Sequence, residues 1–156
     1  MKHRLPIVTM PGWAQSEQSK RDQALKEATA LQSLLAHTGR DDDMGHWSSL
    51  MEISLRMCRI VSDTKQHPYL DPAAVKEAHK VFTRSAWALH KAMHRKQETG
   101  VYGFDAADRA ALIEAEDYVA AFRESVPRLV WARAIREALT AKKGVSLTPL
   151  EQLEAA

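Results

Sequence analysis

Apolar residues recur at steps of three and four positions along most of the chain, the spacing of helices that bury one face. Six segments show this spacing: 14–37, 44–62, 71–97, 105–125, 127–142 and a short piece after residue 148. No stretch shows the alternation of polar and apolar residues that is typical of a half-buried strand. The pattern predicts an all-α, single-domain bundle of five to six helices, and the short connections predict mostly antiparallel neighbours.

The predicted helices differ in how their apolar positions are distributed. Apolar residues fall on most sides of the segment 44–62, which places it in the middle of the bundle, with Trp47, Leu50, Met57 and Val61 buried. The segments 14–37 and 71–97 each have one apolar stripe that we expect to face the core. These stripes are Ala24, Leu25, Ala28, Leu31, Leu34 and Leu35 in the first, and Val75, Ala78, Phe82, Ala86, Leu89 and Met93 in the second.

Capping residues and prolines mark where the helices begin and end. Asp71 followed by Pro72 predicts one helix start, and Asp105 predicts another. Pro127 interrupts a helical pattern, so we expect a break or kink near that residue. Two prolines in the first 13 residues predict an extended N-terminal arm, which leaves 14–156 as the helical domain.

Composition indicates an ordinary globular protein. The 156 residues are 45% hydrophobic and 27% charged, with a formal net charge of +2. The single cysteine, Cys58, excludes an internal disulfide. We expect no signal peptide and no membrane span, and hence a cytoplasmic protein. Abundant alanine and arginine with scarce isoleucine suggest a bacterial, phage or plasmid origin.

Candidate catalytic and metal motifs are weak. His90 and His94 have the i, i+4 spacing that chelates a divalent ion, and His79 lies on the same flank. No third ligand stands at a suitable spacing, however, and the neighbouring lysines and arginines would repel a cation. The serines lack a nucleophile elbow and the glycines form no phosphate loop. We therefore expect no catalytic site, no cofactor and no metal, with the three histidines incidental.

The distribution of charge carries the most information. Six basic residues and one acid lie between positions 76 and 96, whereas the stretch 105–124 holds six acids against two arginines. Helical geometry places five of these residues on one face away from the predicted core: Lys80, Arg84, Trp87, Lys91 and Arg95. This face has three possible roles: a solvated surface partly neutralised by a neighbouring helix, a phosphate-binding stripe, or a protein-binding hot spot.

These observations predict a non-catalytic binding or regulatory protein that docks onto another protein through this face. Tryptophan and arginine are the residues enriched at such interfaces, and a homodimer is one form the interaction could take. The alternative is a nucleic-acid-binding regulator that uses the basic face of the helix 72–97. Salt separates the two, because phosphate binding weakens steeply as salt rises.

Overall fold

The computed structural model describes residues 17–155, and this part of the chain is α-helical, with no strand. The helices are α2 (Glu17–Leu35), α3 (Asp41–Val61), α4 (Pro72–Thr99), α5 (Ala106–Ser125), α6 (Arg128–Thr140) and α7 (Leu150–Ala155). The predicted all-α bundle is confirmed, as is the break at Pro127, which separates α5 from α6. The predicted arm 1–13 lies outside the described residues.

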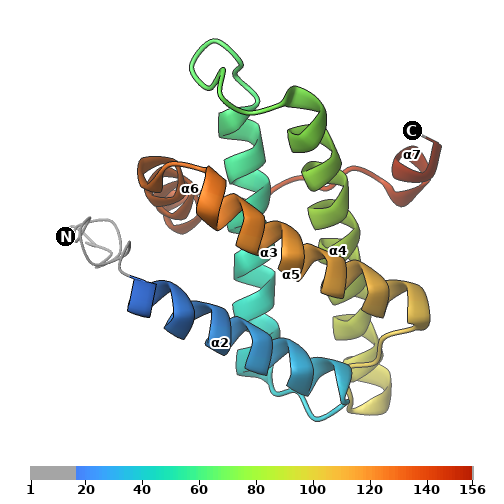
Figure 1. Ribbon diagram of the computed structural model, residues 1–156. Coiled ribbons are helices and arrows are strands. Elements are labelled where there is room, and N and C mark those ends of the chain that lie inside the picture. The colour runs from blue at the N-terminus through green and yellow to red at the C-terminus, as the bar shows by residue number, and fades with distance from the viewer. Residues whose placement is uncertain (1–16, 156) are drawn as a thin grey trace.

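The helices are arranged around an antiparallel pair, α3 and α4 (Figure 1). Helices α2 and α5 cross this pair on one side, α6 packs against α3, and α7 packs against α4. Helix α3 contacts α2, α4 and α6, which is the central position predicted for it from its wide apolar surface. Trp47, Leu50, Met57 and Val61 are all buried, as expected.

Local sequence signals account for most helix ends. The Asp71 carboxylate accepts a hydrogen bond from the Ala73 amide at 3.1 Å, and Pro72 occupies the first turn. The Asp105 carboxylate accepts one from the Asp108 amide at 2.8 Å. Gly100 ends α4 with φ +80°, a left-handed conformation that favours glycine. Helix α3 begins at Asp41 rather than at the predicted Met44, so Asp41, Asp42 and Asp43 form its first turn.

The structure corrects the predicted core face of two helices. In α2, Leu25 is 66% exposed and Ala24 and Ala28 are exposed, whereas Glu27 is buried. In α4, Met93 is 39% exposed and Ala86 is half-buried. The core positions there are set by contact with both α3 and α5, and they include small residues: Ala78, Val81, Ser85, Ala88 and Ala92. Periodicity located each stripe, but packing against neighbours decided which side was buried.

One end of the bundle is held by polar contacts. The Tyr102 hydroxyl donates to the Asp41 carboxylate at 2.5 Å, and Lys96 lies 3.3 Å from the same carboxylate oxygen. The Lys96 ammonium also lies 4.4 Å from the centre of the Tyr102 ring.

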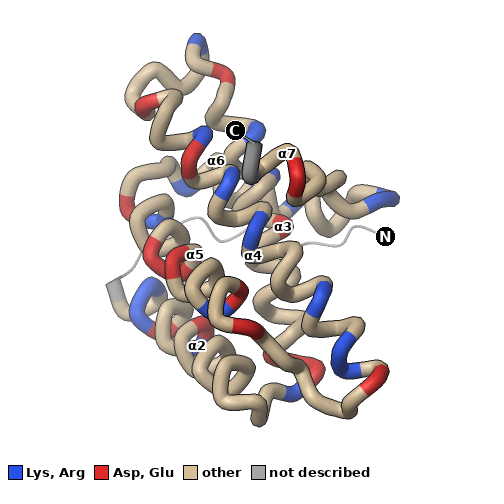
Figure 2. The backbone as a smooth tube through the Cα atoms, turned by 90° about the vertical axis from the view of Figure 1, so that its right-hand side faces the viewer, with Lys and Arg blue, Asp and Glu red and all other residues tan. Residues whose placement is uncertain are grey.

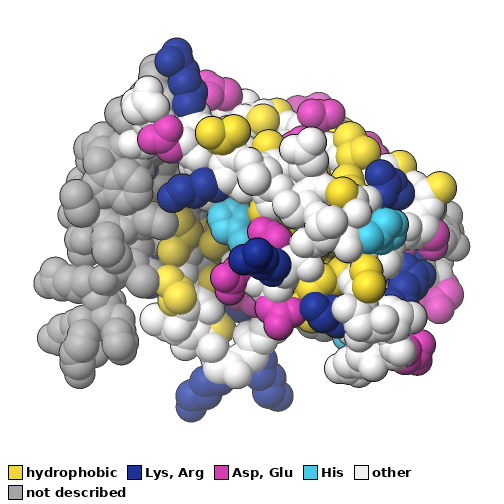
Figure 3. Space-filling view, turned by 90° about the horizontal axis from the view of Figure 1, so that it is seen from below, with side chains coloured by type: hydrophobic (Ala, Val, Ile, Leu, Met, Phe, Trp, Pro, Cys, Tyr) yellow, Lys and Arg dark blue, Asp and Glu magenta, His cyan; other side chains and the backbone are white. Residues whose placement is uncertain are grey.

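The surface of the bundle carries charge of both signs. On the face seen from below, basic and acidic side chains lie beside one another (Figure 3). Across the described helices, none combines the length and the apolar character needed to cross a membrane.

Candidate functional surfaces

The five residues of the predicted partner-binding face lie along one side of α4. Lys80, Arg84, Trp87, Lys91 and Arg95 are all half-buried rather than fully exposed. The tube view shows the basic positions of α4 near the acidic positions of α5 (Figure 2). The structure therefore brings the five together on one helix face, but the face divides into a paired end and an unpaired end.

Lys91 and Arg95 form the paired end. Their cationic nitrogens lie 2.8 and 3.5 Å from the two carboxylate oxygens of Asp108, which is 6% exposed. Arg95 also donates to the Gly103 carbonyl at 2.8 Å. The amide of Asp108 and the charges of Lys91 and Arg95 lower the pKa of Asp105. These two cations are neutralised by the first turn of the neighbouring helix, which is one of the roles that the sequence left open.

Trp87 is partly covered by the C-terminal segment. Its indole nitrogen donates to the Thr148 carbonyl at 2.8 Å, and its ring meets the His90 ring edge-on at 5.5 Å between centroids. Sequence periodicity showed that Trp87 lies away from the core of α4. Periodicity gives no indication that the indole N–H of Trp87 donates to the backbone carbonyl of Thr148, 61 positions later.

Lys80 and Arg84 form the unpaired end. Among the described residues, neither side chain lies within ion-pair distance of a carboxylate. The same is true of Lys76, one turn earlier and exposed. This end of the face keeps its positive charge available to an external partner.

The described histidines and Cys58 do not assemble a reactive centre. His90 and His94 are exposed, with ring centroids 4.7 Å apart. Within residues 17–155, no three side chains of His, Cys, Asp or Glu are grouped so that they could hold a metal. Burial raises the pKa of the Cys58 thiol to about 12, so that thiol is protonated at neutral pH. It therefore lacks the thiolate that nucleophilic chemistry needs.

A groove between α2 and α5 was not foreseen from the sequence. Its volume is about 470 Å³, and its two walls are helix faces that run side by side in Figures 1 and 2. This α2–α5 groove is lined by Ala28, Leu31, Gln32, Leu35, Ala36, Arg109, Ile113 and Glu116. Ile113 is 49% exposed, and Leu25 lies one turn before Ala28 on α2. The sequence signal for this surface is the apolar stripe of α2, which periodicity predicts to face the core and whose Ala24, Leu25 and Ala28 are exposed in the structure.

Acidic side chains border the α5 side of this groove. Glu116 lines the groove itself, and Asp117, one turn after Ile113 on the same face of α5, is exposed. Burial, and then the charges of Asp117 and Glu27, raise the pKa of the Glu116 carboxyl. At the opposite end Arg109 donates to the Leu35 carbonyl, so its charge is directed onto the end of α2. The open part of the groove is therefore apolar with an acidic border.

No family model, curated protein or solved structure matches this chain. Function therefore rests on the geometry and charge of these surfaces.

Proposed function

We propose that the chain is a non-catalytic binding protein that docks onto another protein, and that the α2–α5 groove receives the partner. The observation that carries the proposal is the exposed apolar surface of Leu25 and Ala28 on α2, with Ile113 exposed on the α5 wall of the groove. Contiguous exposed apolar surface next to a groove is typical of interaction sites, whereas scattered single residues are not. We place this role in the cytoplasm, because the chain has only one cysteine and forms no internal disulfide.

The shape and border of the groove define the partner's chemistry. Two helix faces side by side form a channel that suits an amphipathic helix with apolar anchors at i, i+3, i+4 and i+7. The acids Glu116 and Asp117 favour a partner with lysine or arginine beside its apolar stripe. The partner segment we propose is thus a basic amphipathic helix of a second protein.

This assignment moves the docking surface away from the face of α4 predicted from the sequence. Lys91 and Arg95 already bind Asp108, and Trp87 already binds Thr148. An external partner would have to break these contacts before using those side chains. The side chains of Leu25 and Ile113 would lose only water on binding.

The test compares Ile113→Ser with Leu129→Ser, which alters a more exposed apolar residue of α6. Leu129 is 75% exposed and does not line the groove. A model peptide with leucines at helical spacing and flanking lysines should bind the wild-type protein, measured by fluorescence anisotropy. Ile113→Ser should weaken binding about tenfold or more, the scale of an interface anchor, and Leu129→Ser should not. Equal binding by all three proteins would refute the groove.

A capture experiment connects the groove to a natural partner. Cross-linking in extracts of the native host should yield a protein that wild type and Leu129→Ser retain and Ile113→Ser loses. Sedimentation velocity on the purified chain distinguishes self-association, since a dimer that Ile113→Ser dissociates would identify a second copy as the occupant. A protein captured equally by all three variants would not use this groove.

The second candidate function is nucleic-acid binding by the unpaired end of the α4 face. Lys76, Lys80 and Arg84 have no carboxylate partner in the described part of the chain, and this favours phosphate contact. Lys80→Glu combined with Arg84→Glu should abolish oligonucleotide binding and its salt dependence. If the wild-type protein binds no oligonucleotide even at low salt, this function is excluded.

A further inference from the structure

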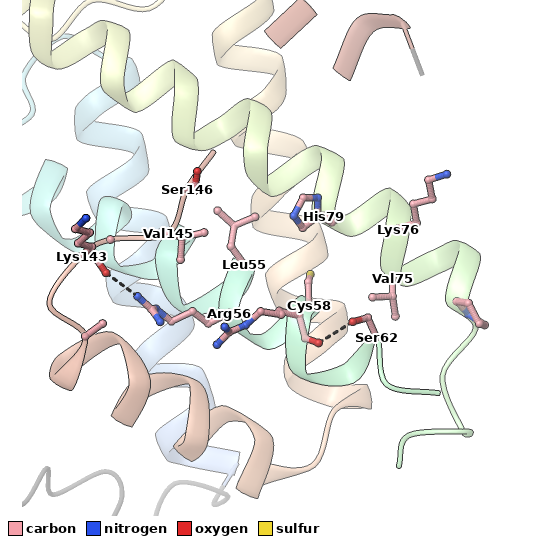
Figure 4. Close-up of a pocket in the computed structure, with 14 residues that line it drawn as sticks. Leu55, Arg56, Cys58, Ser62, Val75, Lys76, His79, Lys143, Val145 and Ser146 are labelled. Atoms are coloured by element: carbon pink, nitrogen blue, oxygen red, sulfur yellow. Dashed lines mark hydrogen bonds between the residues drawn. The ribbon is translucent and has the colours of Figure 1, made fainter. Parts of the chain in front are cut away.

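A second, larger cavity lies between α3, α4 and the segment 141–146, away from the groove (Figure 4). Its volume is about 680 Å³, within the range of about 300–1,000 Å³ that is usual for small-ligand sites. Fourteen residues of α3, α4 and the segment 141–146 line it, and Figure 4 draws them as sticks.

Much of the wall is apolar. Leu55, Val75 and Val145 contribute aliphatic side chains, and the Cys58 thiol is neutral because burial raises its pKa. The imidazole of His79 points into the cavity in Figure 4. Burial lowers the pKa of His79, so the ring is an uncharged polar group at neutral pH. These groups suit the apolar body of a ligand.

The charged residues of the lining are all basic. Arg56, Arg59, Lys76 and Lys143 line the cavity, and no aspartate or glutamate is among the fourteen. Figure 4 shows the Lys76 ammonium directed away from the cavity, which leaves Arg56, Arg59 and Lys143 as its basic lining. The Arg56 side chain is 9% exposed, whereas that of Arg59 is 65% exposed. Glu52 and Glu137 pair with Arg56 and Arg59 from outside the lining. The excess positive charge of the lining is therefore carried by Lys143 and Lys76, for which no carboxylate partner lies within ion-pair distance among the described residues.

The two guanidinium groups retain unused donors. Arg56 contacts the Glu52 carboxylate through Nε at 3.4 Å and donates through Nη2 to the Lys143 carbonyl at 3.3 Å. The second of these bonds ties the segment 141–146 to α3 and so fixes one wall of the cavity. Arg59 binds Glu137 through Nη2. A guanidinium has five N–H donors, so each arginine can still donate to an anion.

From this combination we infer that the cavity is a binding site for a small amphipathic carboxylate, with its head on Arg56 and Arg59 and its apolar body against Leu55, Val75 and Val145. A guanidinium is planar and matches the two oxygens of a carboxylate. A purely inorganic anion would leave the apolar wall in contact with water, and a cation would meet two like charges. The inference is independent of docking at the α2–α5 groove.

Octanoate is the probe for this site, with octylamine and inorganic phosphate as controls. Isothermal titration calorimetry should detect octanoate binding, and amide shifts in NMR spectra should map it to Val75, His79 and Val145. Octylamine tests whether the head group must be negatively charged, and phosphate tests whether the ligand must have an apolar body. The inference fails if either control binds as tightly as octanoate. It fails equally if octanoate gives no binding up to about 10 mM, the weak end of specific affinity.

A matched pair of arginines tests the position of the head group. Arg59 and Arg133 both bind the Glu137 carboxylate, but only Arg59 lines the cavity. Arg59→Gln should weaken octanoate binding about tenfold, as expected for loss of a charged hydrogen bond, while Arg133→Gln leaves it unchanged. Thermal melting of both variants verifies that each remains folded. Equal effects of the two substitutions, or none from Arg59→Gln, would overturn the site.

Discussion

The Glu27 carboxylate accepts two hydrogen bonds from the Arg123 guanidinium, at 2.9 and 2.6 Å, and so joins α2 to α5. Glu27 is 3% exposed, and its backbone carbonyl also accepts the indole N–H of Trp47 at 3.0 Å. The Arg123 guanidinium lies 5.7 Å from the Trp131 ring. This buried pair holds α2 with Glu27 inward, which turns Leu25 outward and produces the exposed stripe of the groove.

Arg123→Ala should lower the free energy of unfolding by about 3–5 kcal/mol, because it leaves the Glu27 carboxylate buried without its cation. Urea denaturation measures the loss. Replacing both Glu27 and Arg123 by leucine should cost less than Arg123→Ala alone, since no unpaired charge remains. A loss of under about 0.5 kcal/mol from Arg123→Ala, typical of a surface change, would contradict the pair.

Leu50→Ala should destabilise the protein by about 2–5 kcal/mol, because it leaves a cavity in the most enclosed helix. Leu50 is 7% exposed, whereas Leu129 is 75% exposed and provides the control. Leu129→Ala should change stability by no more than about 0.5 kcal/mol. Chemical denaturation of the two variants under one set of conditions gives the comparison. Similar losses from both would mean that α3 is not central.

Trp87→Phe keeps an aromatic ring but removes the N–H that binds the Thr148 carbonyl. We expect a loss of about 0.5–1.5 kcal/mol, the usual contribution of one hydrogen bond. Hydrogen exchange should become faster in the segment 141–155, because the contact attaches that segment to α4. Unchanged exchange there would show that Trp87 does not anchor the C-terminal segment.

Tyr102 should titrate far above an ordinary tyrosine. Its hydrogen bond to Asp41, burial and the Asp41 charge raise its pKa from 10.0 to about 12. Because the folded pKa is the higher one, this stabilisation is complete below pH 10 and is lost as pH rises through about 12. Asp41→Asn should lower the pKa of Tyr102, followed by NMR of its ring resonances.

Asp42→Asn is the control for this titration, because Asp42 is an exposed acid of the same helical turn. It should leave Tyr102 unchanged. The same contact, together with Lys96, lowers the pKa of Asp41. Stability from that carboxylate is therefore present above its unfolded pKa and is lost as pH falls through the lower folded value. If Tyr102 titrates identically in wild type and Asp41→Asn, the hydrogen bond is not formed in solution.

The protein should carry no stoichiometric metal. His90 and His94 could supply two ligands, but the described residues place no third one beside them. Elemental analysis of protein purified without chelators should show zinc, nickel and iron well below one atom per chain. A ratio near one that disappears in His90→Ala would overturn this prediction.

The helices and most of their ends are predictable from residues close together in the chain. Capping by Asp71 and Asp105, the stop at Gly100 and the break at Pro127 depend on residues within a few positions of one another. The central place of α3 was also predictable, because a helix with apolar residues on most sides must be enclosed by neighbours. These are local or compositional properties, and they can be deduced without knowing which helices meet.

Which helix faces are buried and which charges are paired depends on contacts between helices that are distant in the sequence. Glu27 binds Arg123 across 96 positions, and Trp87 binds Thr148 across 61. Both contacts depend on how the helices cross, and helical periodicity contains no information about crossing. For the same reason the groove beside Leu25 and the cavity beside Arg56 and Arg59 emerged only with the fold, since each has walls from separate helices.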